Sequence, residues 1–147
     1  MKEHTPFYQW YLFAAWLIAL FAMLYSLYSS EIAGMAVCPL CWYQRICLYP
    51  LAIIIGIGAF NADIHAVRYA IALPMIGSVF ALYQYLEQMI PGFSPINICT
   101  AGGDCSAIHF KWLGFITFPL LSFAACWIIV ILLYLARSAE RRHSLRW

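Results

Sequence analysis

Charged side chains are scarce in this chain, and their scarcity excludes most classes of soluble protein. Asp, Glu, Lys and Arg together make up 10% of the 147 residues, whereas 65% of the residues are hydrophobic. The mean hydropathy of +0.82 is far above the range of soluble globular domains. A formal net charge of +2 does not point to nucleic acid as a partner. The composition therefore predicts an integral membrane protein.

The chain also lacks the alternating apolar and polar pattern of membrane β-strands. Its apolar residues form continuous runs, and lipid offers no hydrogen-bond partner to an open strand edge. A helix needs about 20 such residues to cross a hydrocarbon layer about 30 Å thick. Four runs reach this length, over residues 7–28, 42–60, 67–86 and 112–135. We therefore expect an all-α bundle of four transmembrane helices, forming a single membrane domain over residues 1–147.

A signal-peptide cleavage site is a further feature that the first run lacks. Residues 7–28 exceed the roughly 7 to 15 apolar residues of a secretory signal core, and no clear small-residue cleavage site follows them. We therefore expect this run to remain in place as the first transmembrane helix.

The few basic residues are unevenly distributed along the chain. Most lie at the N-terminus, in the turn between the second and third runs, and in the C-terminal tail: Lys2, Arg68, Arg137, Arg141, Arg142 and Arg146. With four crossings these three regions share one side of the membrane, which by the positive-inside rule is the cytoplasm. We therefore expect both termini in the cytoplasm and two extracytoplasmic loops, residues 29–41 and 87–111.

The cysteines are divided between these loops and the membrane runs. Four of the six lie in or at the ends of the loops, where disulfides persist: Cys38, Cys41, Cys99 and Cys105. The other two, Cys47 and Cys126, lie inside the second and fourth runs, where a free cysteine usually behaves as a small apolar side chain. The loop cysteines are therefore the candidates for redox chemistry.

Cys38 and Cys41 form a CxxC pair at the outer end of the second run. Pro39 suits the first position of a helix, so Cys41 is expected in its opening turn, close enough to Cys38 for a disulfide. The helix N-terminus and Arg45, one turn after Cys41, both stabilise negative charge on its sulfur. We therefore expect Cys41 to be the sulfur held as a thiolate.

The positive charge of Arg45 lies near the N-terminus of the helix, where the helix dipole disfavours a cation, and at the boundary of the hydrocarbon. Both features cost free energy, so some interaction at this position must offset the cost. It could be a simple interfacial anchor whose side chain reaches the headgroups. Alternatively it could stabilise an anionic sulfur or a polar carbonyl of a bound ring. Trp42 could border such a ring, although aromatic residues are common at membrane interfaces.

Cys99 and Cys105 are separated by five residues that include Gly102 and Gly103. Such a loop can close a disulfide and can also move, because glycine leaves the backbone free. The pair could be a structural bridge of the outer loop. It could also exchange its disulfide with the first pair through attack by a thiolate.

These motifs together resemble the bacterial DsbB/BdbC family of disulfide-bond formation proteins. They are Cys38-Pro-Leu-Cys-Trp-Tyr-Gln-Arg45, Tyr85-Leu-Glu-Gln-Met-Ile-Pro-Gly-Phe-Ser94, the Cys99 to Cys105 pair and Trp112-Leu-Gly-Phe-Ile-Thr-Phe-Pro119. The resemblance covers nearly the whole chain, and the short second loop is similar to the BdbC-type branch.

The resemblance implies a quinone-dependent disulfide oxidoreductase of the bacterial cytoplasmic membrane. Such an enzyme reoxidises a thioredoxin-fold partner of DsbA or BdbD type, supports disulfide formation in exported proteins, and passes the electrons to ubiquinone or menaquinone. Cys99 would form the mixed disulfide with the partner, and Cys105 would then attack Cys38. Cys41 would be freed beside the quinone, where Arg45 stabilises negative charge and Trp42 is a further candidate contact.

The chain departs from the longer-loop members of that family at two places. Those members carry a histidine directly after the glutamate at the end of the third helix, where this chain has Gln88. Their second cysteine pair is also much more widely separated than Cys99 and Cys105. A proton-handling role at position 88 and the movement of the second loop are therefore not carried over from the resemblance.

Two readings of another kind remain open. Four cysteines on one side could bind zinc or copper(I), although structural zinc sites favour closer cysteine spacings than that of Cys99 and Cys105. The chain could also be a tetraspan scaffold whose disulfides only brace its loops. Metal analysis of the purified protein distinguishes a metal-binding protein from an oxidoreductase. A reaction with quinone and reduced partner distinguishes an oxidoreductase from a scaffold.

Overall fold

The computed structural model describes residues 7–35, 37–90, 92 and 114–145, and this part of the chain is helical. Its helices are α1 (Phe7–Glu31), α2 (Pro39–Phe60), α3 (His65–Ala70), α4 (Ala72–Met89) and α5 (Phe118–Ser144). Four spans are long and apolar enough to cross a membrane: α1, α2, α3 together with α4, and α5 as far as Arg142. The predicted all-α fold with four transmembrane helices is confirmed.

At the connection between the first two spans, the helices extend further than the predicted ranges. Helix α1 continues to Glu31 instead of ending at residue 28, and α2 begins at Pro39 instead of residue 42. The connection is therefore residues 32–38, shorter than the predicted loop of residues 29–41. The difference arises because hydropathy locates the apolar run, whereas Cys38 and Pro39 determine the start of the helix.

At the end of α4 and at both ends of α5, the predicted bounds also differ from the structure. Helix α4 continues to Met89, so that Glu87 and Gln88 lie in its last turn. Helix α5 begins at Phe118 instead of residue 112, after a turn in which Gly114 has a positive φ of 83°. It then continues to Ser144 instead of residue 135, because alanine, arginine and glutamate prolong a helix beyond the apolar run.

The third span is interrupted between α3 and α4, at Ile71. Pro74 lies one turn later, and it has no N–H to donate to the carbonyl of Ala70. The chain nevertheless keeps its direction, because Ile71 N–H donates to the Val67 carbonyl at 3.1 Å and Met75 N–H to the Ile71 carbonyl at 3.4 Å. One apolar segment, His65–Met89, thus forms two helices along a single crossing.

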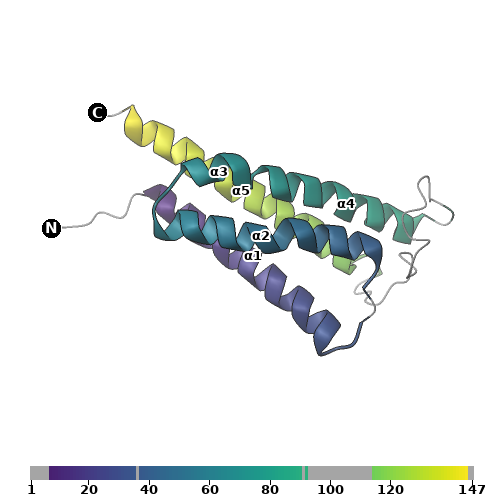
Figure 1. Cartoon of the computed structure of the whole chain (residues 1–147). Helices are drawn as coiled ribbons and strands as arrows, with labels where there is room; N and C mark the ends of the chain where they lie inside the picture. Colours follow the sequence, from purple (N-terminus) through teal and green to yellow (C-terminus); the bar gives the residue numbers. More distant parts are fainter. Residues whose placement is uncertain (1–6, 36, 91, 93–113, 146–147) are drawn as a thin grey trace.

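The four spans pack as a ring in which each contacts two neighbours. Helix α1 packs on α2 and α5, and α4 packs on the same two helices. The start of α1 and the end of α5 lie at one end of the bundle, and α2 begins at the opposite end, where α1 diverges from the other helices (Figure 1). The CxxC pair therefore lies at the end opposite to the described chain ends.

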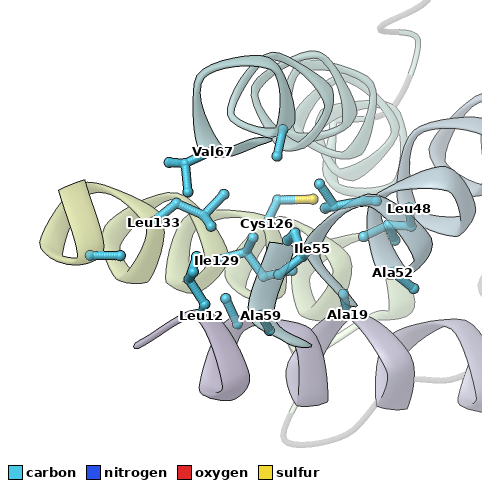
Figure 2. Packing of buried hydrophobic residues seen from close by; sticks show 14 residues of the cluster. Leu12, Ala19, Leu48, Ala52, Ile55, Ala59, Val67, Cys126, Ile129 and Leu133 are labelled. Carbon is cyan, nitrogen blue, oxygen red and sulfur yellow. The ribbon is translucent and has the colours of Figure 1, made fainter. Parts of the chain in front are cut away.

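The apolar core fills the centre of the ring. Its buried members come from α1, α2, α3 and α5, and Figure 2 shows Leu12, Ile55, Val67, Ile129 and Leu133 pointing toward one another. Alanines at the helix contacts, including Ala15, Ala19 and Ala59, are completely buried. Small residues at contacts let transmembrane helices approach closely, which is the main source of their association in lipid.

At Gly56, helices α1 and α2 lie so close together that there is no room for a side chain. A Cβ built on Gly56 would lie 2.8 Å from Nε1 of Trp16, on the neighbouring α1. We predict that Gly56→Ala destabilises the bundle by about 1 to 3 kcal/mol, because the indole must move within packed surroundings. The melting temperature of the purified protein in detergent measures this loss.

Ile53→Ala is the matched control for this substitution. Ile53 lies on the same helix but is 65% exposed, on the face that would contact lipid. Its truncation should leave the melting temperature close to that of the wild type. Equal melting temperatures for Gly56→Ala and the wild type would show that α1 and α2 are not packed as described.

Candidate dithiol site

The CxxC pair lies at the N-terminus of α2, in the geometry that the sequence predicts. Cys38 is the N-cap, with extended backbone (φ −77°, ψ 161°), and its sulfur accepts the N–H of Cys41 at 3.4 Å. Pro39 follows at the start of the helix, where a missing N–H costs nothing. The cap therefore fixes both cysteines relative to the helix.

The two sulfurs face each other as free thiols. Their Sγ atoms are 2.8 Å apart, and Cys38 is buried whereas Cys41 is partly accessible. The hydrogen bond with Cys41 and, next, burial raise the pKa of the Cys38 thiol. The Cys38 thiol is therefore harder to deprotonate than an ordinary cysteine thiol.

Two glutamine side chains complete the surroundings of the sulfurs. Gln84, on α4, donates from its amide nitrogen to Cys38 Sγ at 3.2 Å and to Cys41 Sγ at 3.3 Å. Its amide oxygen accepts from Gln44 Nε2 at 2.7 Å, and both glutamines are buried. Helix α4 thus contacts the dithiol directly through a polar side chain.

Arg45 lies one turn after Cys41 on α2 and is only 9% exposed. Its Nε donates to the hydroxyl of Ser26 and its NH2 group donates to the Ser26 carbonyl, both at 2.9 Å. The guanidinium carbon is 5.6 Å from the centre of the Trp42 ring. The hydrogen-bond partners that the described residues provide to Arg45 are neutral atoms of Ser26. The positive charge of the guanidinium can therefore stabilise a negative group beside it.

A cavity of about 520 Å³ opens between α1, α2 and α5 beside this cluster. Most of its walls are apolar, with Phe21, Tyr25 and Phe118 among the larger side chains. Its polar lining consists of three serines of α1, one serine of α5 and four side chains at the dithiol: Ser26, Ser29, Ser30, Ser122, Cys41, Gln44, Arg45 and Gln84. The cavity is thus a largely apolar chamber in which Cys41 and Arg45 share one wall.

The structure brings together three of the five residues expected to carry the chemistry. Cys38, Cys41 and Arg45 converge at the start of α2. Cys99 and Cys105 lie outside the described residues, so their pairing stays a prediction. Trp42 does not line the cavity, is 55% exposed and contacts Arg45 instead. Its position favours a role in holding the guanidinium.

Sequence reasoning missed Ser26, Gln44, Gln84 and Ser122. Buried polar side chains in transmembrane runs are costly, and that cost is the signal that could have selected the two glutamines. Serine hydroxyls give a weaker signal, because a serine can bond to its own helix, as Ser29 does to the Tyr25 carbonyl at 2.8 Å. Their relation to Arg45 depends on how the helices are rotated, which the sequence does not specify.

A metal site at this pair would need ligands other than Cys38 and Cys41, and Cys99 and Cys105 lie outside the described residues. Within the ranges 7–35, 37–90, 92 and 114–145, no three His, Cys, Asp or Glu side chains gather where they could hold a metal ion. Cys38 and Cys41 supply two ligands at most. The contacts at this pair are hydrogen bonds to amides and to each other, which is an arrangement for thiol chemistry.

Comparisons with known proteins agree with this geometry. The family model described as "Disulfide bond formation protein DsbB" matches residues 8–136. "Disulfide bond formation protein C" of Bacillus subtilis (strain 168) is 45% identical over 130 residues, which cover 88% of this chain and 94% of that protein. A "Probable disulfide formation protein" of Coxiella burnetii (strain RSA 493 / Nine Mile phase I) is 50% identical over 126 residues, 85% and 86% of the two chains.

The match extends over all four membrane spans, and no solved structure matches the chain. A family model that covers most of the sequence, relatives that align along most of their own length, and a CxxC pair at the mouth of a membrane bundle agree with one another. The chain therefore belongs to the DsbB family of membrane proteins that act in disulfide bond formation.

Proposed function

We propose that the chain is a thiol:quinone oxidoreductase of the bacterial cytoplasmic membrane. It oxidises the dithiol of a DsbA-like thioredoxin-fold partner on the extracytoplasmic side and delivers the electrons to a membrane quinone. One observation carries the proposal: Cys41 and Arg45 line the same apolar chamber within the membrane span. The cavity lies between membrane-spanning helices, and it brings a reactive sulfur next to a buried cation. This arrangement favours an electron acceptor that is itself soluble in lipid.

The cavity fits a quinone headgroup in size and chemistry. Its volume of about 520 Å³ lies in the usual range of small-molecule sites, roughly 300 to 1,000 Å³, and its walls are mostly apolar. The hydroxyl of Ser122 lines the cavity and is buried, and none of the described residues forms a hydrogen bond with it. A buried hydroxyl without a partner costs free energy, and a ring carbonyl would supply the missing partner. A bound quinone would accept two electrons and two protons from the dithiol.

Each residue of the wall then has a role set by its surroundings. Arg45 is held by Ser26 and stabilises negative charge on Cys41 and on a ring oxygen. Cys38 retains its proton because its thiol pKa is raised. Ser122 orients a carbonyl from the opposite wall, on α5, and the aromatic side chains of the lining offer apolar contacts to the ring.

The second cysteine pair completes the electron path in this proposal. Cys99 forms a mixed disulfide with the reduced partner, and Cys105, released as a thiolate, attacks Cys38. The bond between Cys38 and Cys41 breaks, and Cys41 leaves as a thiolate in the wall of the cavity. The second thiol of the partner displaces Cys99 and completes the partner disulfide, and Cys99 then attacks Cys105 and releases Cys38 as a thiol. The two electrons lost by the partner then lie on the Cys38 and Cys41 dithiol, from which they pass to the acceptor as the Cys38–Cys41 bond re-forms.

The test is a coupled assay with purified protein in detergent. Reduced DsbA-like partner and ubiquinone-1 or menadione are supplied without other oxidants, and partner disulfide and quinol are measured together. We expect steady oxidation of the partner with one quinol formed per disulfide. A tetraspan scaffold would form neither product, and partner oxidation without quinol would require an acceptor other than the quinone.

Ser122 provides a specific prediction for the acceptor site. Ser122→Ala should weaken quinone binding about 2- to 10-fold, the effect of losing one neutral hydrogen bond. Quenching of tryptophan fluorescence by the quinone measures binding without turnover. Ser29→Ala is the matched control, because the Ser29 hydroxyl lines the same cavity but already donates to the Tyr25 carbonyl. Equal affinities for the Ser122 variant and the wild type would place the ring elsewhere.

A further inference from the structure

Gln84 is the polar residue of α4 that contacts the reactive sulfurs. It is 3% exposed, and Phe80 and Tyr83 of the same helix pack against the buried cluster of Cys38 and Leu40. A buried amide in a transmembrane helix is costly unless its donors and acceptor are bonded. The buried Gln84 amide therefore needs an acceptor for its NH2 group and a donor for its oxygen.

The orientation of the Gln84 amide is fixed from its oxygen side. Gln44 Nε2 donates to Gln84 Oε1 at 2.7 Å. The Gln84 NH2 group must then face the sulfurs, which lie at 3.2 Å for Cys38 and 3.3 Å for Cys41. One amide thus donates to both members of the pair.

A donor placed in this way does not act equally on the two redox states. A hydrogen bond to a charged acceptor is roughly twice as strong as one between neutral groups. The reduced pair can carry a negative sulfur, whereas the sulfurs of a disulfide are neutral and weak acceptors. The Gln84 donors therefore favour the reduced pair, and stabilising the reduced form makes a disulfide a stronger oxidant.

We propose that Gln84, oriented by Gln44, is a positioning residue that sets the redox equilibrium of the Cys38–Cys41 pair and makes its disulfide more oxidising. The inference extends the proposed function, since a more oxidising pair accepts electrons more readily from an oxidising partner. Reduction of the disulfide takes two electrons and, when one sulfur stays a thiolate, one proton. The electrons come from the thiol that attacks the pair.

The test measures the equilibrium of this pair without quinone or partner protein. The full chain carries Cys99→Ser and Cys105→Ser, and it is equilibrated with mixtures of reduced and oxidised glutathione. The fraction of Cys38–Cys41 disulfide is read by maleimide labelling of the free thiols under denaturing conditions, with Cys47 and Cys126 as a constant background. The readout does not depend on quinone, so it stands even if the proposed acceptor is wrong.

Gln84→Leu should shift the equilibrium toward the disulfide by about 10-fold or more, the effect of losing a hydrogen bond to a charged sulfur. Gln84→Met should shift it in the same direction, because a thioether has no hydrogen-bond donor. The methionine variant keeps the length of the side chain and adapts to its surroundings, so it remains informative if the leucine variant does not fold. Gln44→Leu should give a smaller shift of the same sign, because the Gln84 amide is then free to turn.

Phe80→Leu is the matched control, since Phe80 packs against the cluster of Cys38 and Leu40 but offers no donor. It should leave the equilibrium within about two-fold of the wild type. The proposal is overturned if the folded Gln84 variants have the wild-type equilibrium. It is equally overturned if Phe80→Leu shifts the equilibrium as far as they do, because the effect would then come from packing alone.

Discussion

Cys41→Ser is expected to reduce partner oxidation to the rate of the uncatalysed mixture. Cys41 is the sulfur that both contacts Cys38, at 2.8 Å, and lines the apolar chamber beside Arg45. Serine has nearly the same size, but its hydroxyl neither forms a disulfide nor carries a stable negative charge near neutral pH. Without Cys41, electrons that reach Cys38 have no route into the chamber. Simultaneous measurement of partner disulfide and quinol tests this loss.

The control for this variant is Cys47→Ala. Cys47 lies on the same helix and is 6% exposed, but it faces Gly77 of α4 inside the bundle, away from the dithiol. Its replacement should retain most of the activity. If Cys41→Ser turned over at a rate close to that of Cys47→Ala, electrons would leave the protein by a path that avoids this sulfur.

Arg45→Met is expected to lower kcat/KM for the quinone by about 10- to 100-fold. Methionine fills much of the same space but removes the charge, and a hydrogen bond to a charged group contributes about 1.5 to 3 kcal/mol. The Arg45 guanidinium is buried and bound to Ser26 through two of its nitrogens, so it is placed before any ligand enters. Arg45→Lys keeps the charge but loses this planar fork, and it should have an intermediate effect.

Two measurements distinguish loss of charge from loss of fold. Arg137→Met, at the opposite end of the bundle on α5, removes a charge far from the chamber and should leave kcat/KM unchanged. Thiol exchange between reduced partner and the Cys99–Cys105 pair in the absence of quinone should also continue in Arg45→Met. An Arg45→Met variant with the wild-type quinone dependence would leave only the interfacial-anchor role for this residue.

The four spans could be predicted because the lipid imposes one simple requirement, a continuous apolar run of sufficient length. The ends of the helices could not, since they depend on local features that hydropathy does not register. The N-cap at Cys38 places the start of α2 at Pro39, and Pro74 divides the third span at Ile71. The turn at Gly114 precedes the late start of α5 at Phe118.

The cysteine pair and Arg45 could be placed together from sequence because they lie within two turns of one helix. Periodicity alone puts Cys41 and Arg45 on a common face. Gln84 and Ser122 reach the same site from α4 and α5, and their approach depends on the rotation and crossing of helices distant in sequence. The contacts that Gln84 and Ser122 make across helices could therefore be found only from the structure.

Photolabelling with an azido-quinone tests most directly whether the cavity beside Cys41 binds the quinone. After irradiation of the purified protein, labelled peptides are mapped by mass spectrometry, with and without an excess of unlabelled quinone. We predict label on the cavity walls of α1 and α5, around Phe21 and Phe118, which the excess quinone prevents. Competed label confined to the lipid-facing side of α2, at Ile53 and Ile57, would contradict the account.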